Sequence, residues 1–209
     1  MLCLPILLLT ASLGGAVNSH WLYKYGFQKY DVSQTTGLAQ SELDKVARGL
    51  ISYFNSDDED ITLTVVKDGE PFELFTPEEV IHFKDVKGLI WLDYWLLLGT
   101  LVYILAYAGV SLFWRKDRRQ LAWGLVGGSG ITLALMLAFG LGIRFGFGEL
   151  FYQFHLVFFS NEFWSAEGYM LLLFPQGFWS DAALFCALAT ALGAVVLGGT
   201  AALYLKRSK

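Results

Sequence analysis

The chain has 209 residues, of which 55% are hydrophobic and only 16% are charged, whereas about 25% of the residues of an average soluble domain are charged. A net charge of −4 gives no sign of nucleic-acid binding, and two cysteines without CxxC spacing exclude a disulfide framework or a thiol redox motif. The 17 Phe, 10 Tyr and 7 Trp exclude intrinsic disorder, so the composition is that of a small integral membrane protein.

Long uncharged runs predict the membrane spans. A helix that crosses the bilayer needs about 20 mostly apolar residues. Four runs satisfy this, and we predict spans at 1–19, 94–114, 121–143 and 182–205. For the first run a cleaved signal peptide is the alternative, because the stretch 11–16 is rich in small residues.

Basic residues in short loops predict the orientation. The loop 115–120 carries four basic residues and the tail 206–209 carries three. Such loops stay on the cytoplasmic side, so with four spans we expect both termini to be cytoplasmic. The segments 20–93, with 14 acidic and 7 basic residues, and 144–181 then lie outside.

The segment 20–93 predicts a small α+β domain. Apolar residues follow a helical period after Ser41, a candidate N-cap, at Leu43, Val46, Ala47, Leu50, Ile51 and Phe54. Alternating residues on both sides of 67–70 predict a β-hairpin. Thr76, Pro77 and Glu79 together predict the start of a helix that continues through His82 into the second span.

The segment 144–181 is unusually aromatic, which suits the level of the lipid headgroups. The run 151–159 is too short to cross the bilayer, so we predict an interfacial or re-entrant helix there. The expected fold is therefore a mostly α-helical membrane protein with four spans, a small α+β domain between spans one and two, and an aromatic segment between spans three and four.

Histidine is scarce, and its three positions are all predicted near the outer membrane surface. His82 shares a helix face with Glu78, Glu79 and Asp85, and a carboxylate in such a place raises the basicity of an imidazole. A surface salt-bridge cluster is the alternative there. His155 lies among aromatic residues, where its charged form is disfavoured; an interfacial polar side chain is the alternative. His20 is interpreted as an interfacial anchor.

Other chemistry lacks a motif. The chain has no GxSxG elbow, HExxH helix or Walker loop. No histidine or cysteine spacing supports a metal site, and neither a metal nor a cofactor is predicted. Asp93 and Asp181 stand at the beginnings of spans rather than in mid-membrane, which argues against a transporter.

Two motifs resemble the lipoprotein intramolecular transacylase (Lit) family. The residues 76–87, TPEEVIHFKDVK, are similar to the family's His-x-x-Asp-Val-Lys stretch. The residues 154–164, FHLVFFSNEFW, followed by Leu-Phe-Pro at 173–175, are similar to its aromatic His-x-x-Phe-Phe and later Pro motif. The order of parts also matches, and the resemblance covers nearly the whole chain.

The resemblance implies a reaction at the outer face of the bacterial cytoplasmic membrane. The substrate is a diacylglyceryl-modified lipoprotein, whose sn-2 acyl chain moves from the glycerol to the α-amino group of the N-terminal Cys and leaves a lyso-form lipoprotein. We expect His82 and His155 to be the acid–base pair, without a covalent intermediate, and Asp85 to orient His82.

Further residues are expected to bind substrate or to stabilise the oxyanion, namely Lys87, Arg144, Tyr152, Asn161 and Trp164. The aromatic segment and the grooves between spans would hold membrane lipid chains. Two alternatives remain at this point: a lipid or lipoprotein acyl hydrolase that uses the same pair, and a membrane module that binds a lipid or a partner without catalysis. The oligomeric state is not encoded in these patterns.

Overall fold

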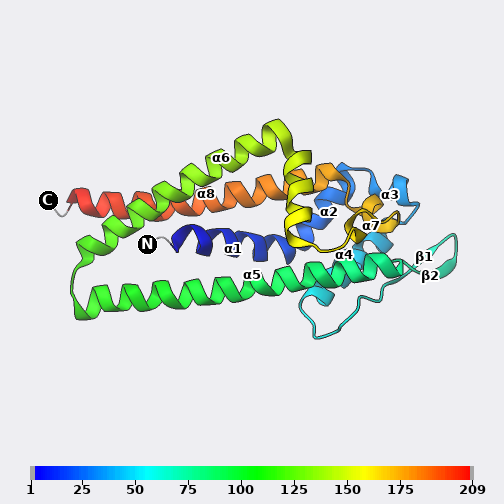
Figure 1. Ribbon diagram of the computed structural model, residues 1–209, viewed down its shortest axis with the longest axis horizontal. Helices are drawn as coiled ribbons and strands as arrows, with labels where there is room; N and C mark the ends of the chain where they lie inside the picture. Colours follow the sequence, from blue (N-terminus) through cyan, green and yellow to red (C-terminus); the bar gives the residue numbers. More distant parts are fainter. Residues whose placement is uncertain (1–2, 208–209) are drawn as a thin grey trace. The chain divides into compact units, whose positions relative to one another are not determined.

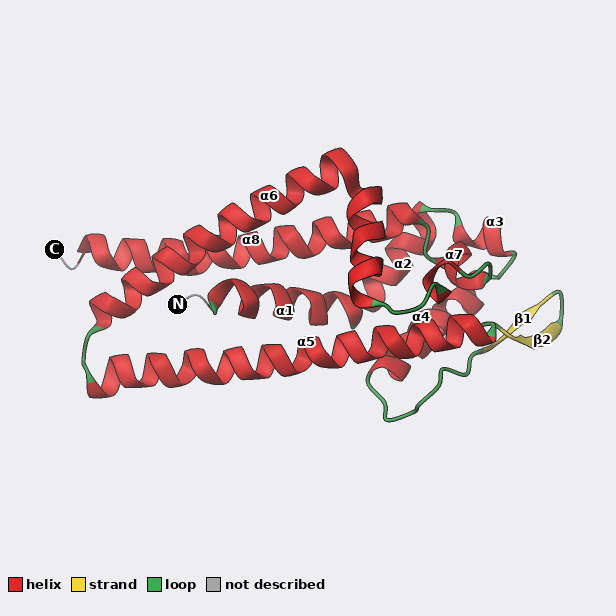
Figure 2. Ribbon diagram, viewed as in Figure 1, coloured by secondary structure: helices red, strands yellow, loops and turns green. Residues whose placement is uncertain are grey.

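The computed structural model describes residues 3–207. It is mostly helical, with one two-stranded hairpin (Figures 1 and 2). In chain order the elements are α1 Leu4–Val17, α2 His20–Lys29, α3 Val32–Thr36, α4 Gln40–Phe54, β1 Thr64–Lys67, β2 Glu70–Glu73, α5 Pro77–Gly109, the π-helix η1 Val110–Trp114, α6 Arg118–Phe158, the 3-10 helix η2 Phe163–Ser165, α7 Tyr169–Leu173 and α8 Gln176–Arg207.

The chain divides into two compact units. The first contains Met1–Gly15, Leu92–Phe145 and Ala183–Lys209, and the second contains Ala16–Trp91 and Gly146–Ala182. Helices α5, α6 and α8 each contribute to both units. Most of each predicted span falls in the first unit, and the three histidines fall in the second.

In the described part of the chain, three helices are long and apolar enough to cross a membrane: Pro77–Trp114, Arg118–Phe158 and Gln176–Arg207. At 1.5 Å per residue the first is about 57 Å long, well beyond the roughly 30 Å of a hydrocarbon core. Each of the three helices is longer than this core, so part of each helix extends beyond it. The fourth apolar helix, α1, has only 14 residues, or about 21 Å, which is shorter than the predicted span.

Small residues pack α1 into the first unit. The Thr190 hydroxyl of α8 donates to the Ser12 hydroxyl at 3.0 Å, and a Cβ at Gly193 would stand 3.0 Å from Leu8. Close approach of backbones through small residues is typical of helix pairs in membranes.

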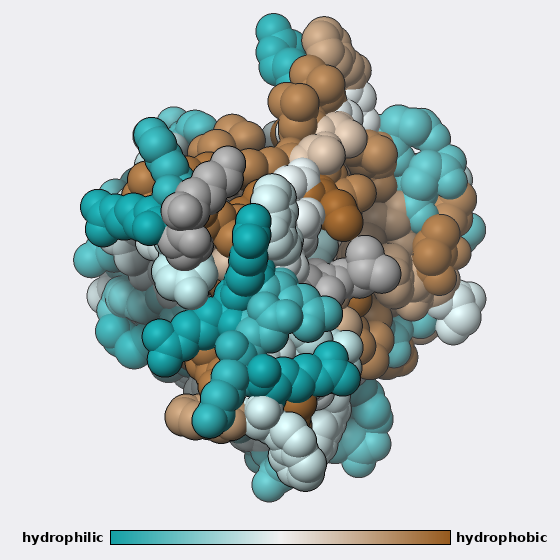
Figure 3. Space-filling view, turned by 90° about the vertical axis from the view of Figure 1, so that its left-hand side faces the viewer, coloured by the Kyte–Doolittle hydropathy of each residue, from teal (hydrophilic) through white to brown (hydrophobic). Residues whose placement is uncertain are grey.

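Exposed basic residues lie in the loop between η1 and α6 and at the end of α8. Arg115, Lys116, Arg118, Arg119, Lys206 and Arg207 are all exposed. Figure 3 looks onto the end of the molecule where these segments lie, and it shows hydrophilic residues gathered in the foreground with apolar residues around them.

Helix α4 buries the predicted apolar stripe. Leu43, Val46, Ala47, Leu50 and Phe54 are all buried, as is Tyr53, whereas Ile51 is only partly covered. The predicted cap was wrong, because the helix begins at Gln40 after Ala39 and no side chain caps it. Ser41 instead lies in the first turn.

The predicted hairpin is present with a shorter first strand than the alternation suggested. Lys67 pairs with Glu70, and Asp68 and Gly69 form the turn with φ of 55° and 88°. Positive φ at both turn residues matches the twist of the strands, and it explains why Asp-Gly stands there.

Helix α5 begins with the predicted capping box. The Thr76 hydroxyl accepts from the Glu79 N–H at 3.3 Å, and the Glu79 Oε2 accepts from the Thr76 N–H at 2.8 Å. The helix then continues without a break past His82 into the apolar stretch, as predicted.

Helix α6 is kinked at Gly146, where the backbone leaves helical geometry (φ −164°, ψ 44°). The part after the bend, 147–158, is the arm of α6. It contains most of the run for which a separate interfacial helix was predicted, and it places His155 in the second unit.

Gly26 of α2 provides a stability test. A Cβ there would collide with the Phe178 ring, whereas a Cβ at Gly88 of α5 would meet nothing within 4 Å. We expect Gly26→Ala to destabilise the protein by about 1–3 kcal/mol through overpacking, and Gly88→Ala to be neutral or stabilising by up to about 1 kcal/mol. Thermal unfolding in detergent measures both, and equal effects of the two variants would contradict the observed packing.

Candidate active site

The structure brings His82 and His155 together although 72 residues separate them. Their ring centroids lie 6.1 Å apart with the planes inclined at 27°. His82 comes from the second turn of α5 and His155 from the arm of α6. Both side chains are buried, with 6% exposure each.

Aromatic rings enclose the pair. Phe159 lies 4.8 Å from the His82 ring and 5.3 Å from the His155 ring. Phe151 and Trp164 approach His155 to 4.2 and 4.7 Å. This enclosure removes most of the water that would stabilise an imidazolium.

The hydrogen bond of His155 identifies its tautomer. Its Nδ1 lies 2.6 Å from the carbonyl oxygen of Phe151. Because a carbonyl only accepts, Nδ1 carries the proton, and the lone pair of the neutral ring is on Nε2. The Nδ1 of His82 is buried without a hydrogen-bond partner among the described residues. An unsatisfied buried group costs stability and is often a sign of function.

Both histidines lie outside the predicted spans, and burial lowers the pKa of each. Burial, with a smaller contribution from the nearby His155, lowers the pKa of His82 to about 4, and the Asp85 carboxylate opposes both. Burial also lowers the pKa of His155, against the Phe151 carbonyl, which stabilises the protonated ring. At neutral pH both rings are therefore uncharged and able to accept a proton.

Asp85 hydrogen-bonds to Asn161 rather than to His82. The Asn161 amide donates to Asp85 Oδ2 at 2.9 Å, and the Asn161 Oδ1 accepts from the Phe163 N–H at 3.1 Å. Asp85 thus influences His82 through its charge, and Asn161 links α5 to the segment that follows the arm of α6.

Tyr152 and Trp164 lie on the His155 side of the site. Their rings meet edge to face at 5.9 Å, and Trp164 also contacts the imidazole. Tyr152 is one turn before His155 on the same helix face and is 46% exposed.

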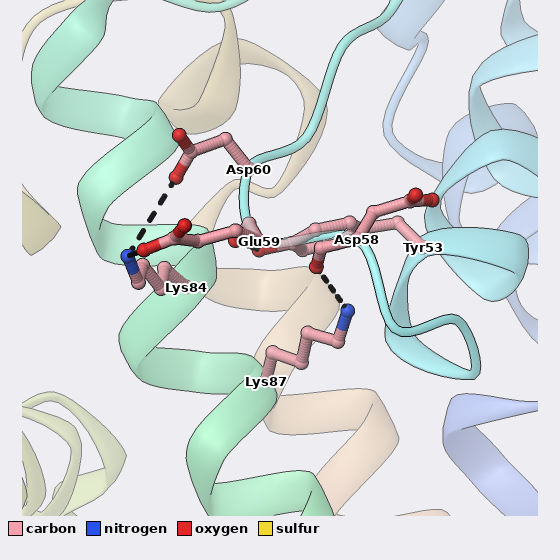
Figure 4. A network of polar contacts seen from close by, with 6 residues as sticks. All are labelled: Tyr53, Asp58, Glu59, Asp60, Lys84 and Lys87. Atoms are coloured by element: carbon pink, nitrogen blue, oxygen red, sulfur yellow. Dashed lines mark hydrogen bonds and ion pairs between the residues drawn. The ribbon is translucent and has the colours of Figure 1, made fainter.

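Lys87 is not brought to the pair. Its ammonium donates to the Asp58 carbonyl at 2.6 Å and lies 4.3 Å from the centre of the Tyr53 ring. Figure 4 shows this contact beside the ion pair of Lys84 with Glu59. Both lysines therefore bind the acidic loop that follows α4.

Arg144 belongs to the first unit, where its guanidinium lies 5.9 Å from the Phe145 ring. Its role in substrate binding stays a prediction.

His20 has a separate environment. Its Nε2 lies 2.8 Å from Asp44, which also pairs with Arg48. A crevice of about 300 Å³ between α2 and α4 includes Asp44 but none of the predicted site residues. Across residues 3–207 no three His, Cys, Asp or Glu side chains come together as a metal site would require.

Two features of the site were not expected from the sequence. Phe159 touches both imidazoles, although in the sequence it was one aromatic among many. Glu79 lies on the face of His82, as expected, but the sequence did not predict that its carboxylate is fully buried and accepts from the Met170 N–H at 2.5 Å. Its capping-box position was the only signal present in the sequence.

The lowered pKa of His82 predicts a pH dependence of stability. Between its ordinary value of 6.5 and its folded value of about 4, the unfolded chain binds a proton that the folded chain does not. The free energy of unfolding should therefore decrease as the pH falls through this range. Thermal unfolding at pH 7 and pH 4.5 measures this, and His82→Gln should reduce the difference. An unchanged difference in that variant would contradict the assignment.

Comparison with known proteins identifies the family. A sequence profile for "Lipoprotein intramolecular transacylase Lit" matches residues 1–179. The crystal structure of Lit from Bacillus cereus is similar with a TM-score of 0.83 at 22% identity, covering 99% of this chain and 92% of that one. Two variants of that protein, with one histidine replaced by arginine or alanine, match with TM-scores of 0.79 and 0.78 at 20% identity. These likenesses show a common fold.

No curated protein sequence matches the chain significantly. The family match covers well over half of the chain and implies a lipoprotein substrate. The chain therefore belongs to the lipoprotein intramolecular transacylase family and is an acyltransferase embedded in the membrane by several spans.

Proposed function

We propose that this protein moves the sn-2 acyl chain of a diacylglyceryl-modified lipoprotein to the α-amino group of its N-terminal Cys, giving a lyso-form lipoprotein. The observation that carries the proposal is the buried pair of imidazoles with centroids 6.1 Å apart. An N–C bond forms, the sn-2 ester C–O bond breaks, and one proton moves from nitrogen to the sn-2 oxygen. Two proton-carrying groups are sufficient for this chemistry.

We assign His155 as the base. Its free lone pair on Nε2 can take a proton from the attacking amine. An α-ammonium group ordinarily has a pKa of about 7.7–8.0, so part of the amine is already neutral near physiological pH. Holding amine and ester together supplies a further large share of the acceleration, because the reaction is intramolecular.

His82 is then the group that protonates the leaving oxygen. Its low pKa makes its charged form a strong acid, which suits donation to an alkoxide. Both rings are neutral at the start, so the proton that His155 takes from the amine passes to His82 during the turnover. His82 then gives this proton to the sn-2 oxygen, and both rings are neutral again. The charge of Asp85 supports the charged form of His82 during this step.

Tyr152 is our candidate for the oxyanion donor. Its hydroxyl has no hydrogen-bond partner among the described residues, and it lies one turn from His155. Asn161 and Lys87 are weaker candidates, because each already donates one hydrogen bond, to Asp85 and to the Asp58 carbonyl. Trp164 and the aromatic arm of α6 would contact the acyl chains.

The proposed topology has four spans, of which 1–19 is the first. Basic residues at 115–119 and at 206–207 favour a cytoplasmic position for that loop and for the C-terminus. The segments 20–93 and 144–181 then lie outside the cytoplasmic membrane with the histidine pair. Removal of 1–19 as a signal peptide is the alternative.

Replacing either histidine should remove transacylation. We expect His82→Ala and His155→Ala each to lower the rate by about 10²–10⁴-fold, the usual contribution of general acid–base catalysis. Mass spectrometry of the N-terminal lipopeptide of a diacylated reporter lipoprotein measures the product, whose mass is unchanged while one acyl chain moves to the amine.

His20→Ala is the matched control, because His20 contacts Asp44 rather than the pair, and it should retain activity. Folded His82 and His155 variants with full activity would refute the acid–base assignment. A product that has lost one acyl mass would instead indicate an acyl hydrolase.

The pH–rate profile should lack an inflection near 6.5. Burial lowers the pKa of both imidazoles, that of His82 to about 4, so loss of the neutral rings is displaced to lower pH. We expect kcat/KM to rise with pH through the α-ammonium range near 8. Measurement of initial rates from pH 5 to pH 9 tests this. A single inflection at 6.5 would mean that the catalytic histidine is well solvated.

A further inference from the structure

Glu79 is a fully buried carboxylate that two backbone N–H groups hold. Its Oε2 accepts from Thr76 at 2.8 Å, which closes the capping box, and its Oε1 accepts from Met170 at 2.5 Å. It is 0% exposed, and no cation pairs with it in the part of the chain that the structure describes. A capping-box glutamate needs only the first of these bonds, so the bond to α7 requires a separate explanation.

The approach of Glu79 to α7 is close. A Cβ at Gly168 would stand 2.5 Å from the carboxyl carbon of Glu79. The backbone at 168–170 therefore lies directly against this carboxylate, and any larger residue at 168 would push it away.

Asp85 makes the equivalent contact on the other side of His82. It accepts from the Asn161 amide at 2.9 Å. Glu79 and Asp85 stand three residues before and three residues after His82, so all three lie on one face of α5. Both acceptors bind the segment 159–173, which begins where the arm of α6 with His155 ends.

We propose that Glu79 and Asp85 are positioning residues that hold the His82 turn of α5 against the segment that follows His155, and so fix the separation of the two imidazoles. The catalytic part of this inference rests on the proposed function. A misplacement of about 1 Å can cost about 10²-fold in rate, so two bonds that flank His82 are placed where they matter most.

The first test compares Glu79→Gln with two controls. Gln offers one acceptor and an NH₂ group, so one of the two N–H groups loses its partner and meets a donor. We expect kcat to fall about 10–100-fold with little change in KM. Glu78→Gln removes the same charge from an exposed neighbouring position, and Thr76→Ala removes only the capping hydroxyl. Both should stay within about threefold of the unaltered protein.

A second readout does not depend on catalysis. NMR of ¹⁵N-histidine-labelled protein in detergent reports the titration and tautomer of each imidazole. We expect Glu79→Gln to move the His82 titration from its low position toward 6.5, because a loosened turn admits water. Neither control should shift it.

The Asp85 contact allows a rescue experiment. Asp85→Asn and Asn161→Asp should each lower kcat, whereas the double variant Asp85→Asn/Asn161→Asp restores a hydrogen bond of opposite polarity. If Asp85 acts at this contact by positioning His82, the double variant should recover at least half of the activation free energy that the single variants lose. No recovery would mean that its charge alone matters, and would remove Asp85 from the inference.

The outcomes separate the two proposals. If Glu79→Gln behaves as the two controls do in both kcat and the His82 titration, the positioning role of Glu79 is wrong and the carboxylate only caps α5. If the titration shifts while His82→Ala retains full activity, the positioning role stands and the proposed acid–base function fails.

Discussion

Desolvation of two imidazoles against aromatic rings is the constraint on which the second unit depends. A neutral ring can remain in such a place only if its polar atoms are oriented and its neighbours are held still. His155 satisfies one nitrogen through the Phe151 carbonyl, whereas His82 leaves Nδ1 unsatisfied. The surrounding contacts must offset that cost. Among them are the hydrogen bonds of Glu79 and Asp85, which lie within one turn of His82.

The start of α5 links local sequence to this site. Thr76 and Glu79 close the helix end, and the same carboxylate reaches Met170. The acidic loop after α4 then secures Lys84 and Lys87 on another face of the helix (Figure 4). The local capping box and the tertiary hydrogen bonds thus favour the same position for the first turns of α5. Agreement between local and tertiary interactions is what specifies a single structure.

Features set by neighbouring residues were predictable from the sequence. The α4 stripe, the Asp-Gly turn and the Thr76–Glu79 box each follow from contacts within a few residues. The cap of α4 was predicted wrongly at Ser41, because a side chain able to cap is common and only the path of the preceding chain decides its use. The pairing of His82 with His155 was a hypothesis from their shared place near the outer membrane surface and from the family resemblance, and no local rule gives their separation. Long-range polar bonds could not be predicted from the sequence. The bond between Glu79 and Met170, for example, joins residues 91 apart. Such a pairing depends on which segments the packing of apolar faces brings together.

The bond that fixes the His155 tautomer has a consequence for genetics. Its acceptor is a main-chain oxygen of the same helix, one turn earlier. Every residue type supplies that oxygen, so no side-chain replacement at Phe151 deletes it, and an alanine scan would pass over this determinant. Only an alteration of the peptide unit itself, such as an ester in the backbone after residue 151 that weakens the carbonyl as an acceptor, would reach it.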